Sequence, residues 1–218
     1  TWEISPDLPT GLSFSNGVIS GTPSVNLTYT TYTVWANNSG GSASAIINIT
    51  VNEPIATFGY SPSTVVFTRG VSIADMIPTL GGGYVATWEI SPSLPSGMSL
   101  SNGIISGTPT VNSTQTTYTV WANNTGGSTS TAVNITVNEP LATISYSPST
   151  AVFTRGVSIA DMNPTLGGGY IAIWEISPDL PSGLTISNGI ISGTPAVNST
   201  QVVYTVWANN TGGSASTT

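Results

Sequence analysis

An internal repeat of 86 residues is the feature that most constrains how this chain can fold. Two sets of tryptophans are each spaced by 86 residues: Trp2, Trp88 and Trp174, and Trp35, Trp121 and Trp207. A repeat of this length predicts tandem copies of one small domain instead of a single large core. The 218 residues then divide into a partial repeat over 1–54 with later strands only, a complete repeat over 55–140, and a repeat over 141–218 that lacks its last strand.

Short runs of β-branched and aromatic residues fill the complete repeat. Seven runs are expected to form strands: 55–60, 64–68, 84–91, 98–101, 104–106, 116–123 and 128–137. In the last run Val133, Ile135 and Val137 share one face, the pattern of a half-buried strand. No segment has a helical period beyond at most one turn over 71–76. Seven short strands in one repeat predict an all-β domain of the β-sandwich type.

The stretch SNGIISGTP at 101–109 returns at 187–195, with a near copy at 15–23. It lacks the Lys of a phosphate-binding loop and the G-x-G-x-x-G of a dinucleotide site. An Asn-Gly pair between two apolar runs instead predicts a tight hairpin, because both residues tolerate the positive φ of a type I′ turn. The predicted turns are Asn16–Gly17, Asn102–Gly103 and Asn188–Gly189.

Composition argues against most kinds of chemistry. The chain has no Cys, no His and only two basic residues, Arg69 and Arg155, against nine carboxylates, for a net charge of −7. Most side chains that serve as bases, nucleophiles or soft metal ligands are therefore absent. A negative chain repels nucleic acid and anionic lipid. We predict no enzyme activity, no catalytic, cofactor-binding or metal-binding residue, and no nucleic-acid partner.

Hydroxyl side chains dominate the sequence. It contains 31 Ser and 34 Thr, while charged residues make up 5%, compared with about 25% in typical soluble domains. Such a surface predicts an extracellular or cell-surface location. No apolar run approaches the ~18 residues of a membrane span, and neither a signal peptide nor an initiator Met is present. The sequence looks like a mature or excised piece of a longer protein.

Several motifs together resemble one known family. These are LPSGM at 94–98, GIISGTP at 103–109, YTVWANNTGGS at 118–128 and ITV at 135–137. They are similar to the Putative Ig, or cadherin-like, repeat, with its LPxGL, GxISGTP and YxVxAxNxxGxS pattern. The resemblance implies tandem immunoglobulin-like sandwiches of the kind found in large microbial surface and adhesion proteins. It names no ligand, because the motif residues are turns and core positions.

Carboxylates recur with the repeat: Glu3, Glu89 and Glu175 in WEIS, Asp75 and Asp161 in IAD, and Glu53 and Glu139 in NEP. A glycosidase needs two carboxyl groups at a defined separation in a cleft, and tandem copies of one would be unusual. Solvated faces or turn caps are the simpler interpretation. Structural calcium at Glu139 is the alternative, since this residue lies at a repeat junction, although no Asp-rich loop accompanies it.

Two further groups of residues raise the question of glycans. Sequons for N-glycosylation occur at Asn26, Asn37, Asn48, Asn112, Asn123, Asn134, Asn198 and Asn209. The six Trp and eight Tyr could form sugar-binding platforms, but their return at one phase of every repeat favours core and inter-sheet packing. Tyr118 and Trp121 lie three positions apart in a strand, so one ring is expected in the core and the other partly exposed.

Three functions fit these observations. The first is a non-enzymatic structural protein whose tandem repeats form the shaft of an extracellular filament, stalk or surface layer, with copies of itself or neighbouring repeats as partners. The second is an adhesin or binding module that recognises carbohydrate or protein at a cell surface. The third is an accessory segment of a secreted enzyme. Near-identical repeats favour the first, because a shaft needs equivalent joints whereas a binding site needs only one good copy.

Overall fold

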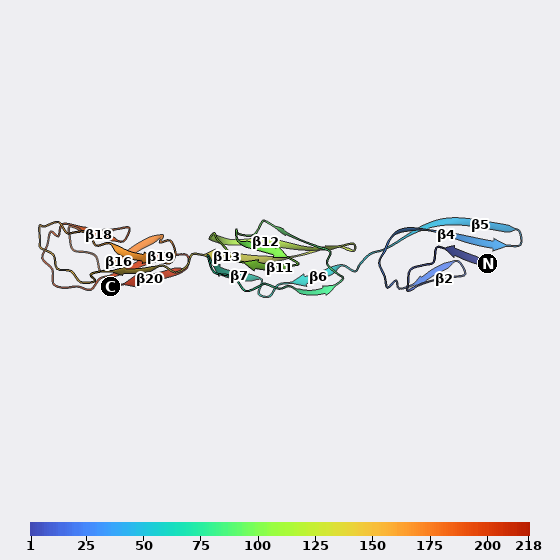
Figure 1. The fold of residues 1–218 in the computed structure, drawn as a ribbon, viewed down its shortest axis with the longest axis horizontal. Helices are drawn as coiled ribbons and strands as arrows, with labels where there is room; N and C mark the ends of the chain where they lie inside the picture. Colours follow the sequence, from blue (N-terminus) through green and yellow to red (C-terminus); the bar gives the residue numbers. More distant parts are fainter.

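The computed structural model describes all 218 residues and consists of strands and loops. Three β-rich units lie in a row along the long axis of the molecule (Figure 1). We call them the first unit (1–54), the middle unit (55–140) and the third unit (141–218). The structure contains no helix that could span a membrane.

Twenty strands make up the three units. The first unit contains β1 (Trp2–Ser5), β2 (Leu12–Ser15), β3 (Val18–Gly21), β4 (Leu27–Asn38) and β5 (Gly41–Val51). The middle unit contains β6 (Ala56–Gly59), β7 (Thr64–Thr68), β8 (Thr79–Gly82), β9 (Thr87–Ser91), β10 (Met98–Ser101), β11 (Ile104–Gly107), β12 (Ser113–Asn124) and β13 (Gly127–Asn138). The third unit contains β14 (Thr143–Tyr146), β15 (Pro164–Gly167), β16 (Ile173–Ser177), β17 (Leu184–Ser187), β18 (Ile190–Gly193), β19 (Thr205–Asn210) and β20 (Gly213–Thr217).

The middle unit is a two-layer β-sandwich. Its main sheet has the strand order β7-β13-β12-β9, in which β12 is antiparallel to both neighbours and β7 is parallel to β13. The pairs β6-β8 and β10-β11 form the opposing layer. Because side chains alternate along a strand, Val120 and Ala122 are fully buried, whereas Trp121 between them lies on the outer face.

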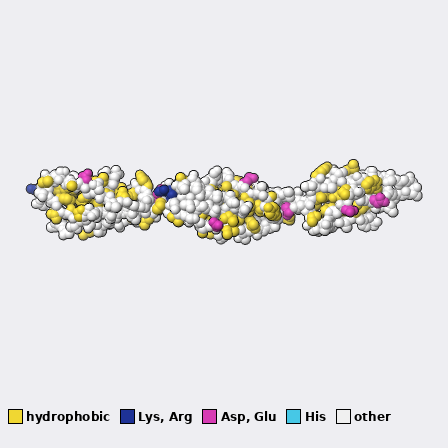
Figure 2. Space-filling view, in the orientation of Figure 1, with side chains coloured by type: hydrophobic (Ala, Val, Ile, Leu, Met, Phe, Trp, Pro, Cys, Tyr) yellow, Lys and Arg dark blue, Asp and Glu magenta, His cyan; other side chains and the backbone are white.

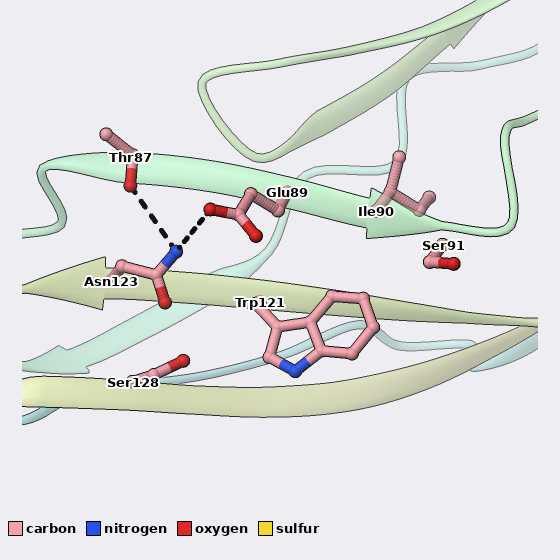
Figure 3. A pocket seen from close by; sticks show the side chains of 7 residues that line it. All are labelled: Thr87, Glu89, Ile90, Ser91, Trp121, Asn123 and Ser128. Atoms are coloured by element: carbon pink, nitrogen blue, oxygen red, sulfur yellow. Dashed lines mark hydrogen bonds between the residues drawn. The ribbon is translucent and has the colours of Figure 1, made fainter.

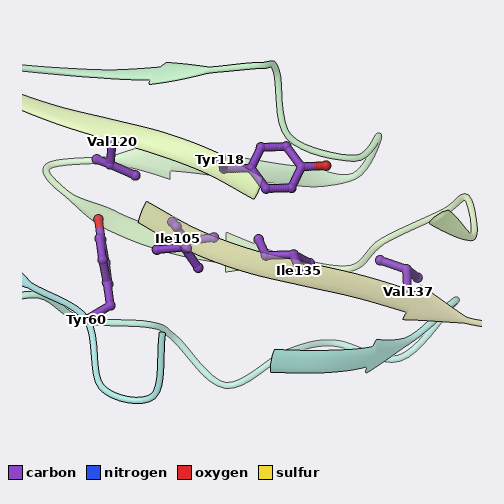
Figure 4. Packing of buried hydrophobic residues seen from close by; sticks show 7 residues of the cluster. Tyr60, Ile105, Tyr118, Val120, Ile135 and Val137 are labelled. Atoms are coloured by element: carbon purple, nitrogen blue, oxygen red, sulfur yellow. The ribbon is translucent and has the colours of Figure 1, made fainter. Parts of the chain in front are cut away.

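The core of the middle unit lies between these layers (Figure 4). Its members are large apolar side chains from both layers: Tyr60, Ile105, Tyr118, Val120, Val133, Ile135 and Val137. The alternation predicted for the closing strand is present, since Val133, Ile135 and Val137 are at most 1% exposed. A single small core of this kind fits a domain of about 86 residues.

The Asn-Gly hairpin turn covers a tryptophan. Asn102 and Gly103 have φ values of 49° and 79° between β10 and β11. A Cβ atom added to Gly103 would lie 2.6 Å from the Trp88 ring, which also packs edge-on against Phe58. The Tyr60 hydroxyl donates a hydrogen bond to the Gly103 carbonyl, and burial raises the pKa of Tyr60 to about 12. The turn is thus held from beneath as well as by its own backbone.

The prediction of at most one helical turn over 71–76 is wrong, because no helix forms there. This segment is extended, and its backbone bonds to β11: Ile73 N–H donates to Gly107 O, and Met76 N–H donates to Ile105 O. The spacing of Ile73 and Met76 therefore reflects an extended chain that pairs with β11 at the edge of the opposing layer and packs these two side chains against the core.

One strand, β8, escaped the sequence prediction. Its residues TLGG have neither alternation nor bulk, and Leu80 is largely exposed. The strand forms because its backbone pairs with β6, where Leu80 lies opposite Phe58. Backbone pairing with a distant strand leaves no local pattern in the sequence.

The outer units repeat parts of this architecture. Their main sheets have the orders β1-β4-β5 and β16-β19-β20. In the third unit, residues 150–154 correspond to β7 but form no strand, and Val152 is 96% exposed. In the middle unit β7 pairs with the segment 134–138 of β13.

Candidate functional site

The junction between the middle and third units is built around Glu139. Arg69, directly after β7, reaches this carboxylate with its Nη2 atom 2.7 Å from Oε2 and its Nε atom 3.2 Å from Oε1. This two-pronged geometry matches the planar guanidinium to both carboxylate oxygens. Glu139 is only 7% exposed, so the ion pair is shielded from water on the carboxylate side.

The same glutamate also contacts the third unit. Its Oε2 accepts a hydrogen bond from Tyr170 N–H at 3.3 Å, and its own backbone N–H donates to Thr211 Oγ1 at 2.8 Å. The next residue is held too, because Asn210 Nδ2 donates to Pro140 O at 2.8 Å. Glu139 therefore connects Arg69 of one unit with the backbone of the next.

Two glycines of the third unit, Gly169 and Gly212, lie in close contact with the connecting backbone of Glu139 and Pro140. We call this pair of glycines the glycine seat. A Cβ atom on Gly212 would lie 2.1 Å from Glu139 O, and one on Gly169 would lie 2.1 Å from Pro140 O. Real Cβ atoms essentially never approach this closely, so only glycine allows the connecting backbone to lie here. Hydrogen bonds and close packing together hold the junction in one geometry.

The first junction uses the same seat without the ion pair. Glu53 N–H donates to Thr125 Oγ1 at 2.9 Å, and Asn124 Nδ2 donates to Pro54 O at 2.7 Å. Gly83 and Gly126 make the matching close approaches to this backbone. The Glu53 carboxylate accepts a hydrogen bond from the Asn26 side-chain amide in place of an arginine.

The charge state of the junction depends on pH. The hydrogen bonds from Arg69 hold the pKa of Glu139 below its ordinary value, and the Tyr170 N–H and the Arg69 charge add to this effect, while burial opposes it. A carboxyl group whose pKa is lowered in the folded state contributes stability above its ordinary pKa. That contribution is lost as pH falls through the lowered value.

We predict that Arg69→Gln loosens the second junction and leaves the first unchanged. The chain has no Cys, so pairs of introduced cysteines can carry spin labels at equivalent exposed serines: Ser44 with Ser130, and Ser130 with Ser216. The unaltered chain is expected to give a narrower distance distribution for the second pair than for the first. Arg69→Gln should broaden the second distribution, and so should titration into the acid range. Equal widths at neutral pH would contradict the assignment.

A second candidate site lies on the outer face of the main sheet (Figure 3). Trp121, Glu89, Asn123, Thr87 and Ser128 line a shallow pocket of about 690 Å³ there. Asn123 Nδ2 donates to Glu89 Oε1 at 3.2 Å and to Thr87 Oγ1 at 3.4 Å, which fixes the amide and the carboxylate side by side. Figure 3 shows the Trp121 indole lying across the strands on the same side of the sheet.

The arrangement recurs because the strand register is the same in every unit. Trp121 lies opposite Glu89 across β12 and β9, as Trp35 lies opposite Glu3 and Trp207 opposite Glu175. In the third unit Asn209 donates to Glu175 at 3.1 Å, and Asn209 Oδ1 has no hydrogen-bond partner. In the first unit the corresponding amide oxygen of Asn37 accepts from Ser42.

The tryptophans therefore belong to two classes. Trp88 packs against the core, as the core interpretation of the aromatic residues predicted. That interpretation is wrong for Trp121, whose side chain lies on the outer face while Tyr118, three positions away, is buried. The three-residue spacing of Tyr118 and Trp121 within one strand correctly predicted that only one of these two rings would be buried.

The remaining predicted carboxylates are spread over the molecule. Asp75 and Asp161 are exposed, and no three acidic side chains gather where they could bind a metal ion. Glu139, considered above as a calcium ligand, instead binds the Arg69 guanidinium. Charged side chains appear as isolated points on the face seen in Figure 2. The sequence patterns did not predict the ion pair between Arg69 and Glu139, although Arg69 and Arg155 recur at the repeat spacing.

The structure places the eight sequon asparagines in three environments. Asn26, Asn112 and Asn198 are exposed in or beside loops before the long central strands. Asn37, Asn123 and Asn209 lie beside the outer-face tryptophans. Asn48 and Asn134 lie within strands, where their amide oxygens accept hydrogen bonds from Thr31 and Thr117. Glycans fit most easily at the loop positions, where no side-chain pair of the sheet is broken.

A row of small two-layer sandwiches joined through short seated connections defines a tandem immunoglobulin-like protein. The chain belongs to the Putative Ig domain family, which matches residues 1–52, 56–138 and 142–218. A search of characterised proteins found no match.

Solved structures with a similar chain course are themselves rows of such domains. An I-band fragment of titin is 15% identical, with 99% of this chain and 85% of that chain covered and a TM-score of 0.43. Immunoglobulin domains 1–5 of Sidekick-1 are 16% identical, with coverage of 99% and 50% and a TM-score of 0.41. The four N-terminal domains of a Dscam1 isoform are 15% identical, with coverage of 85% and 52% and a TM-score of 0.48.

Proposed function

We propose that this chain is a segment of the shaft of an extracellular filament, stalk or surface layer, and that it performs no catalysis. The observation that carries the proposal is Glu139, whose side chain and backbone hold one unit to the next. A flexible tether needs no such contacts, whereas a load-bearing or spacing element needs every joint to keep one geometry. The repeat boundaries at 54/55 and 140/141 are taken as the domain boundaries of this shaft.

Two further features support the proposal. The units lie end to end, so each added repeat lengthens the molecule (Figure 1). Strands of about 12 residues rise ~3.3 Å per residue, which makes each unit about 40 Å long. The surface is rich in Ser and Thr and carries few charges, a composition suited to an extracellular setting with N-glycans at the exposed sequons.

Immunogold electron microscopy of cells that produce the protein would test the shaft directly. An antibody against the middle unit is expected to label projecting fibres, stalks or a surface layer along their whole length. Label confined to the cell interior would contradict an extracellular role. Label confined to the tips of projections would favour the adhesin over the shaft.

The adhesin remains the second candidate because of one specific observation. A shaft requires no binding pocket, yet every unit presents a tryptophan opposite a glutamate on its outer face.

A further inference from the structure

We propose that the pocket around Trp121 binds a neutral polysaccharide, one pyranose ring per unit, and that Trp35 and Trp207, which lie opposite a glutamate in the other units, act with it. We call this site the Trp–Glu–Asn face and define it by Trp121, Glu89, Asn123, Thr87 and Ser128. The proposal does not depend on the shaft function, because a pocket on the sheet face is separate from the junctions.

The first argument is the position of the indole. Trp121 lies between two buried residues of β12, so its side chain must point outward, and the ring lies across the sheet instead of standing away from it. A flat aromatic surface fixed by its strand costs little entropy to engage. It matches the C–H face of a pyranose ring, which is apolar and of similar size.

The second argument is the hydrogen-bonding character of the rim. The Asn123 amide donates to Glu89 Oε1, so Glu89 Oε2 and Asn123 Oδ1 are left as acceptors. Thr87 and Ser128 add hydroxyl groups that both donate and accept. Sugar hydroxyls are donors that satisfy such acceptors.

The third argument is charge, which selects among polymers. Glu89 is the only charged side chain that lines the pocket, and the whole chain has a net charge of −7. Nucleic acid, sulfated polymers and polyuronates are repelled by both. A neutral polymer of hexose or N-acetylhexosamine has no such penalty.

The fourth argument is repetition. The same register places a tryptophan opposite a glutamate in each of the three units. A polysaccharide repeats its own units, so one strand of polymer can engage several faces of one chain. Linked sites raise the overall affinity by about 10²–10⁴ without any new contact. Each single site can then have a low affinity while the whole chain still binds the polymer.

Affinity electrophoresis of the full chain would test the proposal. The negative chain migrates in a native gel, and dissolved polymer that binds it slows its migration. The probes are neutral polymers of glucose, mannose, galactose and N-acetylglucosamine, with polygalacturonate as the anionic comparison. We expect at least one neutral polymer, and not polygalacturonate, to retard the chain.

Variants then assign the binding to the Trp–Glu–Asn face. Trp121→Ala is expected to weaken binding by about tenfold, and Ala at Trp35, Trp121 and Trp207 together by about 100-fold or more. Glu89→Gln keeps the size and removes the charge, so it should weaken binding without disturbing the ring. Thr136→Ala changes the same sheet face away from the pocket and should bind as the unaltered chain does.

Three results would overturn the proposal. The first is that no neutral polymer retards the chain. The second is that a triple Trp variant, shown by circular dichroism to be folded, binds as the unaltered chain does. The third is that polygalacturonate or a proline-rich peptide binds more tightly than any neutral polymer. The last would assign the face to a different class of partner.

Discussion

Replacing Gly212 by Ala is expected to release the connection between the middle and third units while leaving both units folded. The new Cβ atom would lie 2.1 Å from Glu139 O, so the connecting backbone must leave its seat. It would then lose the hydrogen bonds at Thr211 and Asn210. At roughly 1 kcal/mol each, this loss shifts the balance between seated and released junctions by about 30-fold.

The repeat supplies a matched control for this substitution. Gly40 occupies the same position in the first unit, and its N–H donates to Asn38 Oδ1 at 2.8 Å just as Gly212 N–H donates to Asn210 Oδ1 at 2.8 Å. A Cβ atom on Gly40 would meet only the Asn38 side chain, at 3.2 Å. Gly40→Ala should therefore be tolerated.

Spin-label distances between Ser130→Cys and Ser216→Cys would measure the outcome. Gly212→Ala should broaden the distribution across the second junction, and Gly40→Ala should not. An unchanged distribution in Gly212→Ala would show that the glycine seat does not set the junction geometry. Loss of the far-ultraviolet β signal would show that the substitution unfolds the third unit instead.

The second large effect is expected in the hairpin turn of the middle unit, where Gly103→Ala should destabilise that unit by about 3 kcal/mol. Two costs add. The backbone has a φ of 79°, which disfavours any side chain, and the new Cβ atom would lie 2.6 Å from the Trp88 ring. Trp88 is packed against Phe58 beneath the turn and has little room to move.

Gly70→Ala separates the two costs. Gly70 has the same φ of 79°, but a Cβ atom there meets nothing within 4 Å. It should therefore show the backbone cost alone, about 1 kcal/mol. The difference between the variants then measures the contact with Trp88.

Native-state hydrogen exchange of the full chain would report both variants. Peptides from β12 and β13 give the free energy of opening of the middle unit, while the first and third units serve as internal references. Equal losses in Gly103→Ala and Gly70→Ala would show that Trp88 yields to the new side chain. No loss in either would show that positive φ carries no cost in these turns.

Local patterns account for the parts of the architecture that the sequence predicted. The alternation of Val133, Ile135 and Val137 and the Asn102–Gly103 turn depend on residues within a few positions of one another, and the 86-residue period is visible by comparing the sequence with itself. Strand period and turn chemistry act on such short stretches, so they can be read before any tertiary contact is known. The all-β class and the tandem β-sandwich units followed from them, whereas the immunoglobulin-like assignment followed from the family resemblance.

The tertiary structure alone decided which residues meet across the chain. Arg69 and Glu139 are 70 residues apart, β8 pairs with β6 through its backbone, and Glu89 meets Asn123 only because β9 lies beside β12. Each of these contacts depends on the register of strands distant in sequence, which no local period encodes. The core could be predicted because hydrophobic burial leaves a pattern in every strand. The junction and the Trp–Glu–Asn face could not, because each is assembled from single residues contributed by separate strands and loops.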